Sequence, residues 1–105
     1  MNINVIEKSM KYFNECNLEK LTDCFHKDIT FYNLADNSIL MKGIKNCTEA
    51  LRKNTADKDF IWTVENSLKF GNIEIVYSSS GPNKNKVVVI AEIEDGLIKN
   101  VWEAF

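Results

Sequence analysis

The sequence predicts an α+β domain in which short helices cover one face of a mostly antiparallel sheet. Three observations predict it. Apolar residues recur with the period of a helix in the first 25 residues and again in residues 44–56. Between and after these segments, β-branched and aromatic residues alternate with polar ones, as in half-buried strands. Residues typical of turns separate the segments, so the expected order is helix, helix, strand, strand, helix and then four strands, written ααββαββββ.

The three helices are predicted from apolar spacing and from capping residues. Asn4 followed by Glu7 resembles a capping box at the start of the first helix. Asn17 is expected to cap a second, shorter helix, with His26 just after its end, and the third helix is expected over residues 44–56. The apolar faces of these helices contain Ile3, Ile6, Met10, Phe13, Leu18, Leu21, Cys24, Phe25, Ile44, Cys47 and Leu51.

Six strands are predicted from alternation, with boundaries at turn residues. They are expected over residues 28–34, 39–42, 60–70, 73–80, 86–94 and 97–105. Asp95-Gly96 is a strong hairpin signal, because both residues tolerate the positive φ of a tight turn. Alternation divides the last strand into two faces, one with Ile98, Asn100, Trp102 and Ala104, the other with Lys99, Val101, Glu103 and Phe105.

Composition and charge exclude several classes of protein. With 105 residues, the chain is expected to be one domain over residues 1–105 with one hydrophobic core. The formal net charge is −2 and acidic and basic residues are interleaved, so no nucleic-acid partner is expected. No apolar run approaches the ~20 residues of a membrane span, and residues 1–8 do not resemble a signal peptide. We therefore expect a cytoplasmic protein without a membrane partner.

Cysteine and histidine usage predicts neither a disulfide framework nor a metal site. The three cysteines are odd in number and lack a CxxC spacing, which indicates free thiols in a reducing compartment. Cys24 and His26 are close in sequence, but no complete set of ligands accompanies them, so no metal is predicted. The sequence contains no glycine-rich phosphate loop and no nucleophile elbow, and no cofactor is predicted.

Four sequence patterns resemble the nuclear transport factor 2-like superfamily, especially its SnoaL-like and ketosteroid-isomerase-like branch. They are Tyr12-Phe13, residues 17–31 from the second helix into the first strand, Lys42-Gly43-Ile44, and Glu94-Asp95-Gly96-Leu97-Ile98. The resemblance implies a single SnoaL-like domain whose sheet is strongly curved into a cone, a cystatin-like roll, around the helices. It also implies a pocket in the mouth of the cone and a homodimer formed through the convex face, where Trp102 is placed.

The resemblance also assigns catalytic candidates. The general-base Asp of ketosteroid isomerase corresponds here to Asn33, and its protonated Asp corresponds to Val89, so the family's pair of acids is absent. The family's Tyr is matched by Tyr12. The concave face of the last strand is expected to hold Glu103, and burial in an apolar pocket would raise its pKa into the range of a general base. Asn33 could bind a substrate carbonyl or orient a water.

The predicted pocket is apolar, with the lining Phe31, Trp62, Tyr77, Val89, Val101 and Phe105. Two functions stay open. One is a cofactor-independent isomerase or cyclase that acts by proton transfer on a small apolar or carbonyl substrate. The other is a non-catalytic ligand-binding or dimerisation module that has lost the family's acids. Each residue also has a structural alternative: Glu103 at the rim beside a Lys or Arg, Tyr12 at the edge of the core, and Trp62 and Tyr77 in core or interface packing.

Overall fold

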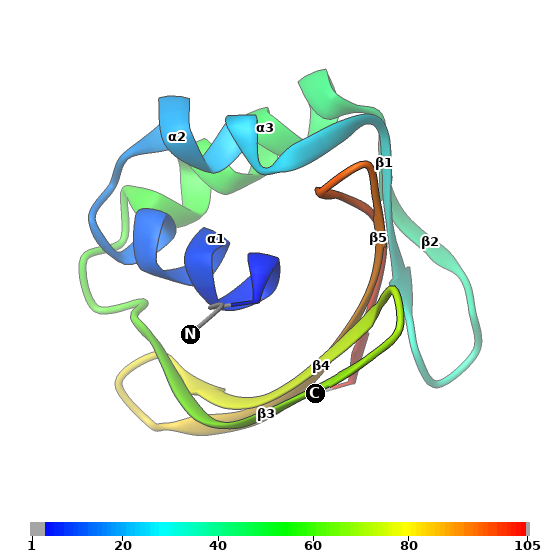
Figure 1. The fold of residues 1–105 in the computed structure, drawn as a ribbon. Coiled ribbons are helices and arrows are strands. Elements are labelled where there is room, and N and C mark those ends of the chain that lie inside the picture. The colour runs from blue at the N-terminus through cyan, green and yellow to red at the C-terminus, as the bar shows by residue number, and fades with distance from the viewer. Residues whose placement is uncertain (1–3, 105) are drawn as a thin grey trace.

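The structure, a computed structural model, describes residues 4–104. It confirms the α+β class and the order ααββαββββ (Figure 1). The helices are α1 (Val5–Asn14), α2 (Leu18–Asp23) and α3 (Ile44–Thr55). The strands are β1 (Phe25–Asn33), β2 (Ile39–Lys42), β3 (Trp62–Phe70), β4 (Ile73–Ser80), β5 (Asn85–Glu94) and β6 (Leu97–Ala104).

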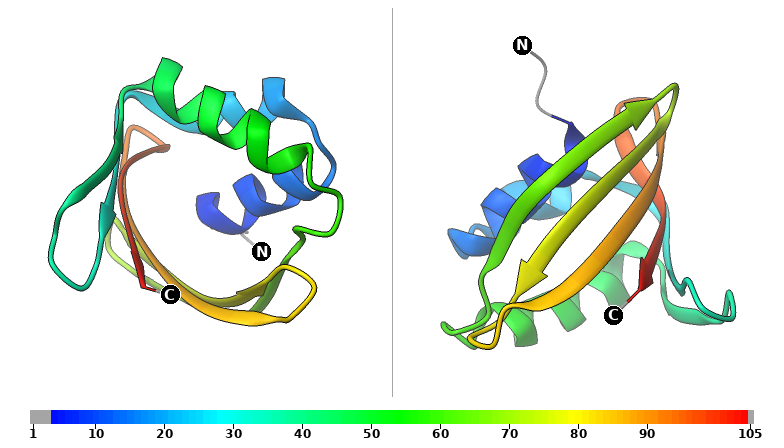
Figure 2. Two further views of the ribbon diagram at one scale, coloured as in Figure 1. Left: turned by 180° about the vertical axis from the view of Figure 1, so that it is seen from behind. Right: turned by 90° about the horizontal axis from the view of Figure 1, so that it is seen from below.

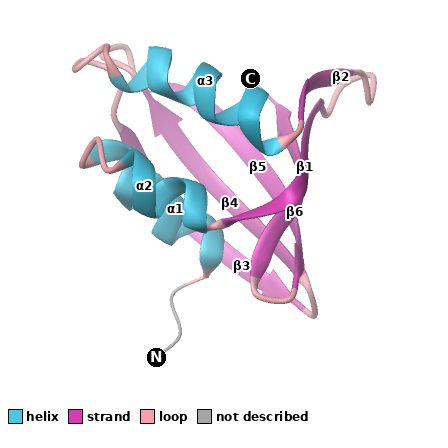
Figure 3. Ribbon diagram, turned by 90° about the horizontal axis from the view of Figure 1, so that it is seen from above, coloured by secondary structure: helices cyan, strands magenta, loops and turns pink. Residues whose placement is uncertain are grey.

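The strands form one curved sheet that wraps around the helices. Its strand order is β2-β1-β6-β5-β4-β3. Neighbouring strands are antiparallel except β1 and β6, which are parallel. In Figures 1 and 2 the sheet curls around α1, and Figure 3 shows all three helices on the same side of it. The sheet therefore has a concave face toward the helices and a convex face away from them.

The predicted caps of the first two helices are confirmed. The Asn4 side chain accepts a hydrogen bond from the Glu7 backbone N–H at 2.8 Å, and that of Asn17 accepts one from the Lys20 N–H at 3.2 Å. Both bonds satisfy N–H groups that have no partner within the helix. They fix where the chain turns from loop to helix.

Asn14, the last residue of α1, ties the helix to the sheet. Its amide nitrogen donates to the Trp62 backbone oxygen at 2.8 Å, and its amide oxygen accepts from the Trp62 N–H at 2.8 Å. These are the two bonds that a neighbouring strand would make with Trp62. The side chain thus extends the hydrogen bonding of the edge strand β3 onto α1.

The first strand begins earlier than the sequence predicts. Phe25, expected on the second helix, and His26, expected just after it, belong to β1, because Phe25 pairs with Ile98 of β6. The Ile98 N–H donates to the Cys24 carbonyl at 2.8 Å, which extends this pairing to the helix end. The parallel contact with β6 thus overrides the helical spacing that Phe25 shares with the residues before it.

The predicted alternation of β6 breaks at Lys99. The hairpin register shifts there: Ile93 pairs with Ile98, but Glu92 pairs with Asn100, so Lys99 is an additional residue on one strand. A bulge of this kind changes which face the residues before it occupy. Ile98 is consequently fully buried together with Val101, although the alternation assigns them to opposite faces.

The concave face of the sheet and the inner sides of the helices form the core. It contains Ile6, Met10, Phe13, Leu21, Cys24, Phe25, Ile29, Phe31, Cys47, Val76, Val87, Val89, Ala91, Ile98 and Val101. No helix within residues 4–104 combines the length and the apolar character that a membrane crossing requires.

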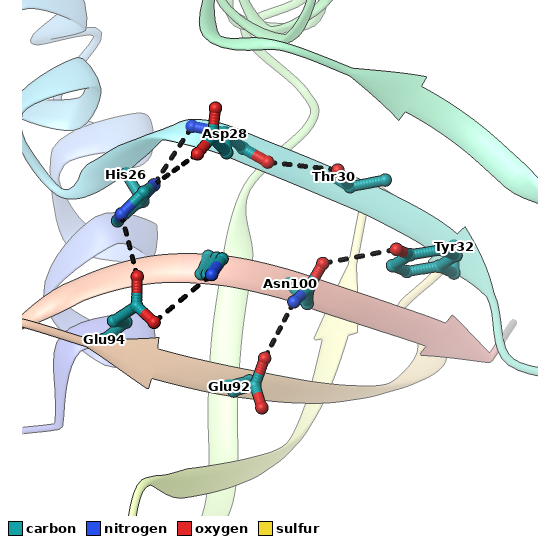
Figure 4. Close-up of polar contacts among 8 residues, drawn as sticks. His26, Asp28, Thr30, Tyr32, Glu92, Glu94 and Asn100 are labelled. Atoms are coloured by element: carbon teal, nitrogen blue, oxygen red, sulfur yellow. Dashed lines mark hydrogen bonds and ion pairs between the residues drawn. The ribbon is translucent and has the colours of Figure 1, made fainter.

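The convex face carries a mixed surface. Tyr32 stacks on Trp102 with ring centroids 5.1 Å apart, and the Tyr32 hydroxyl donates to Asn100 at 3.3 Å. Asn100 in turn donates to Glu92 at 2.7 Å, so three strands are joined by a polar chain beside the stacked rings (Figure 4). The Trp102 indole donates to Asn37 at 2.9 Å and thereby holds the β1–β2 hairpin.

Candidate functional site

A cavity of about 320 Å³ lies between the helices and the concave face of the sheet. Sixteen residues within the described range 4–104 line it; they come from all three helices and from β1, β2, β3, β5 and β6, together with Phe60 in the loop before β3. Thirteen of the sixteen are apolar. The lining residues Leu40 and Asn54 are exposed, so the cavity opens to solvent beside them. Its size is at the lower end of the ~300–1,000 Å³ that ligand pockets commonly have.

Glu103 brings a carboxyl group into this apolar lining. It lies on β6 between Val89 of β5 and Asn33 of β1, and the parity of the strand directs it to the same side as Val101. No hydrogen bond or ion pair joins its carboxyl group to another side chain of residues 4–104. Burial raises the pKa of Glu103 from an ordinary 4.5 to about 7, because the charged form loses its hydration.

A carboxyl group with this pKa can both accept and donate a proton near neutral pH. General acid–base catalysis is most efficient when the pKa of the group is close to the working pH. Perturbed carboxyl groups in apolar cavities are therefore candidates for functional sites. Glu103 lines the cavity and is partly buried, and no Lys or Arg side chain of residues 4–104 pairs with it.

Four further predicted residues line the cavity. They are Phe31 on β1, Trp62 on β3, Val89 on β5 and Val101 on β6. Phe105, also predicted for the pocket, lies outside the described residues.

Tyr77 is not part of the cavity, which corrects its prediction as a pocket residue. It is 42% exposed, and the Lys86 ammonium lies over its ring at 5.6 Å. Its neighbour Val76 is fully buried, so strand parity turns Tyr77 to the convex face. The sequence prediction failed here because alternation identifies two faces but not which one is concave.

Tyr12 and Asn33 do not line the cavity with Glu103. Tyr12 lies on the outer side of α1, in a separate groove between α1 and β3, with the Lys20 ammonium 5.8 Å from its ring centre. Asn33 is beside Glu103 in register, but its side-chain oxygen accepts from the Ala35 N–H at 2.9 Å and shapes the turn after β1. Neither makes a hydrogen bond with Glu103 among the contacts of residues 4–104.

Sequence reasoning missed most of the cavity wall on the helical side. Ile6, Ser9, Met10 and Phe13 of α1 all line it. The helical spacing of the apolar members of this group was visible, but an apolar helix face is normally filled core. The sequence carries no signal that α1 and the sheet leave space between them, because that space depends on sheet curvature.

Glu74 on β4 is a second carboxyl group that sequence reasoning missed. It is fully buried, and its Oε1 accepts the Ile6 backbone N–H at 3.0 Å. Its Oε2 has no hydrogen-bond partner among residues 4–104. The carboxyl group lies at the N-terminal end of α1, where a helix favours acidic side chains. Glu74 therefore anchors the helix that forms one wall of the cavity.

A polar network at the start of β1 lies apart from the cavity (Figure 4). The Asp28 N–H donates to His26 Nδ1 at 3.1 Å, and His26 Nε2 faces Glu94 at 3.0 Å. Lys99 pairs with the other oxygen of Glu94 at 3.2 Å. These contacts connect β1 to the β5–β6 hairpin. Within residues 4–104 no three His, Cys, Asp or Glu side chains are arranged to hold a metal ion.

Comparisons of the sequence return no match, either to a family model or to a curated protein. Comparison of the structure finds many solved relatives of the fold. A nuclear transport factor 2-like protein of unknown function from Mesorhizobium loti superposes with a TM-score of 0.80 at 12% identity, covering 95% of this chain and 86% of that chain. A protein with a cystatin-like fold from Methylobium petroleophilum gives 0.78 at 15% identity, covering 94% and 71%.

A third neighbour was solved with a small molecule. It is a hypothetical protein with a ketosteroid isomerase-like fold from Catenulispora acidiphila, in complex with trimethylamine. It superposes with a TM-score of 0.80 at 12% identity and covers 100% of this chain and 87% of that chain. Identities this low concern the fold alone. The curved sheet, the order of elements and these neighbours together show that the chain has the nuclear transport factor 2-like fold, the cone shared with ketosteroid isomerase-like and cystatin-like proteins.

Proposed function

We propose that the cavity binds a small, mostly apolar molecule and that Glu103 exchanges a proton with it. The observation that carries the proposal is the Glu103 carboxyl group in a mostly apolar lining, with its pKa raised to about 7 by burial. The neighbour solved in complex with trimethylamine supports the idea that a protein of this fold can bind a small molecule. The reaction class would be cofactor-independent proton transfer, as in an isomerase or cyclase.

Binding without chemistry is the second candidate. The observation that favours it is that no side-chain or backbone donor within residues 4–104 makes a hydrogen bond to the Glu103 carboxyl group: Tyr12 lies in the outer groove, and Asn33 does not line the cavity. A proton abstraction that creates an oxyanion depends strongly on such donors. A test of Glu103 therefore needs a reaction that does not require them.

The ring opening of 5-nitrobenzisoxazole is such a reaction. A base removes the ring C–H proton, the N–O bond breaks, and a nitrile and a coloured phenolate form, so one carboxylate in an apolar site is sufficient. We expect wild type to open this probe about 100-fold faster than Glu103→Gln. The rate should rise with pH and level off above about pH 7, because the carboxylate is the active form.

Glu92→Gln is the matched control, because Glu92 lies on the same sheet but its side chain joins the convex-face network with Asn100. It should retain the wild-type rate. Equal rates for wild type and Glu103→Gln would refute proton transfer by Glu103. Binding of the probe without turnover by wild type would favour the non-catalytic module.

We also propose that the convex face forms a homodimer. An apolar row crosses this face in register, from Leu68 to Ile75, Ile90, Trp102 and Tyr32. Leu68 is 63% exposed, and exposed apolar rows of this kind are typical of interfaces. Light scattering after size exclusion should give the dimer mass for wild type and the monomer mass for Leu68→Glu, with Lys45→Glu on the helical side as the control. A monomeric wild type would refute the dimer.

A further inference from the structure

The cavity lining contains one carboxyl group, that of Glu103, and no positively charged partner for it within residues 4–104. Glu103 is its one ionisable lining residue, and no Lys, Arg or His within residues 4–104 lines it. The other polar lining residues are Ser9, whose hydroxyl donates to the Ile6 carbonyl at 2.7 Å, and the exposed Asn54. A buried carboxylate without a counter-charge is costly. A ligand that supplies a positive charge would remove this cost.

The walls of the cavity that Glu103 lines are rich in aromatic rings. Phe13, Phe60 and Trp62 line the cavity. The Phe60 ring packs edge-to-face against both others, with its centroid 5.8 Å from that of Phe13 and 5.6 Å from that of Trp62. Phe25 and Phe31, also in the lining, form a second edge-to-face pair at 6.1 Å. The faces of aromatic rings attract cations, and most strongly cations that carry little water.

Other polar groups fit this cavity less well. A carboxylate or phosphate would meet the like charge of Glu103. A carbonyl oxygen would need a hydrogen-bond donor, and Glu103 provides one only while it holds a proton. Both kinds of ligand would therefore act against ionisation of the carboxyl group, whereas a cation would act with it.

We propose that the ligand is a small tertiary amine, bound as its cation with its single N–H directed to Glu103. This inference rests on the proposed function, since it names the polar group that Glu103 meets. The number of donors selects the tertiary amine: it has one N–H, which Glu103 satisfies, whereas a primary ammonium has three and the described lining offers few other acceptors. If the amine enters uncharged, the carboxyl proton of Glu103 moves to its nitrogen, and no other bond changes.

Three probes of similar shape test this inference. Benzyldimethylamine is the tertiary amine, isobutylbenzene is its neutral carbon counterpart, and benzylamine is the primary amine. Binding is measured by calorimetry and by the methyl signals of ¹³C-labelled methionine, because Met10 and Met41 both line the cavity. At about pH 8 the tertiary amine should bind about tenfold more tightly than the other two probes.

The pH dependence separates a charge effect from a shape effect. Burial is the cause of the raised pKa of Glu103, and no other titratable side chain within residues 4–104 lines the cavity from the helices or the strands. The affinity for benzyldimethylamine should therefore fall about tenfold from pH 8 to pH 6, as the carboxylate takes up a proton. The affinity for isobutylbenzene should stay level or rise over the same range.

Glu103→Gln should weaken benzyldimethylamine binding about tenfold or more and leave isobutylbenzene within about twofold, which also shows that the cavity is intact. Glu92→Gln should change neither. If isobutylbenzene binds as tightly as the tertiary amine at every pH, the amine inference is refuted while ligand binding by the cavity stands. If none of the three probes shifts the Met10 and Met41 signals, both the amine inference and the proposed ligand-binding function are refuted.

Discussion

The carboxyl group of Glu103, which lines the cavity and is partly buried, should make the protein less stable as the pH rises through neutrality. In the unfolded chain this group has an ordinary pKa near 4.5, and in the folded chain burial raises the pKa to about 7. Between these values the folded state holds more protons than the unfolded state, so the free energy of unfolding falls with increasing pH. From about pH 5 to pH 8 the loss amounts to about 2 to 3 kcal/mol.

Glu103→Gln removes this titration and keeps the shape of the side chain. We compare the free energy of unfolding of the variant with that of wild type at each pH. This difference should shift in favour of the variant by about 2 to 3 kcal/mol between pH 5 and pH 8, because the amide is never charged. Urea unfolding followed by tryptophan fluorescence, with Trp62 in the cavity wall, gives both free energies at each pH.

The difference between wild type and variant is the quantity to examine, since it cancels the contributions of the ionisable groups that the two proteins share. Glu92→Gln provides the control for removing a carboxylate from the same sheet, and its difference from wild type should stay nearly constant over this range. The reasoning is refuted if the wild-type and Glu103→Gln curves run parallel between pH 5 and pH 8, or if wild type gains stability relative to the variant.

Three substitutions test the supports of the cavity by the same unfolding measurement. Asn14→Ala removes both hydrogen bonds to Trp62 and should cost about 2 kcal/mol; an unchanged free energy would mean that α1 needs no such tie to β3. Glu74→Ala leaves a buried space and an unpaired Ile6 N–H, so it should lower the free energy of unfolding by about 3 kcal/mol. Glu74→Gln keeps an acceptor and should lower it less. A larger loss for Glu74→Gln than for Glu74→Ala would contradict the anchoring role. Gly96→Ala places a side chain at φ +76° in the last hairpin and should cost about 1 kcal/mol, although nothing crowds the added methyl group.

The fold was predictable because its signals are local. Asn4 and Asn17 cap their helices by bonds to residues three positions ahead, and such bonds are visible in the sequence. Asp95 and Gly96 both adopt positive φ, as the hairpin signal requires. The long-range features were not predictable in this way. The bulge at Lys99 arises from the register between β5 and β6, and no residue type in this part of the sequence predicts it.

The site was predictable in part for the same reason. Once Glu103 and Val101 were assigned to one face of the last strand, the resemblance to a cone fold sufficed to expect them in a pocket. To place Tyr77 correctly, one has to know which face of its strand is concave. To place Tyr12 correctly, one has to know how α1 is rotated about its axis relative to the sheet. Both depend on packing between elements, which periodicity alone does not determine.

The two carboxyl groups on the concave side show why burial alone does not identify a functional acid. Glu74 is the more deeply buried, but its carboxyl group accepts the Ile6 N–H at the start of α1, where the helix favours a negative charge. Glu103 faces an open cavity and has no such partner among residues 4–104. A ligand in the cavity would therefore reach Glu103 without breaking a hydrogen bond of its side chain, whereas replacing Glu74 would remove the acceptor of the Ile6 N–H at the start of α1. Chemistry is expected at the carboxyl group whose missing partner a small molecule can supply, and in this fold that group is Glu103.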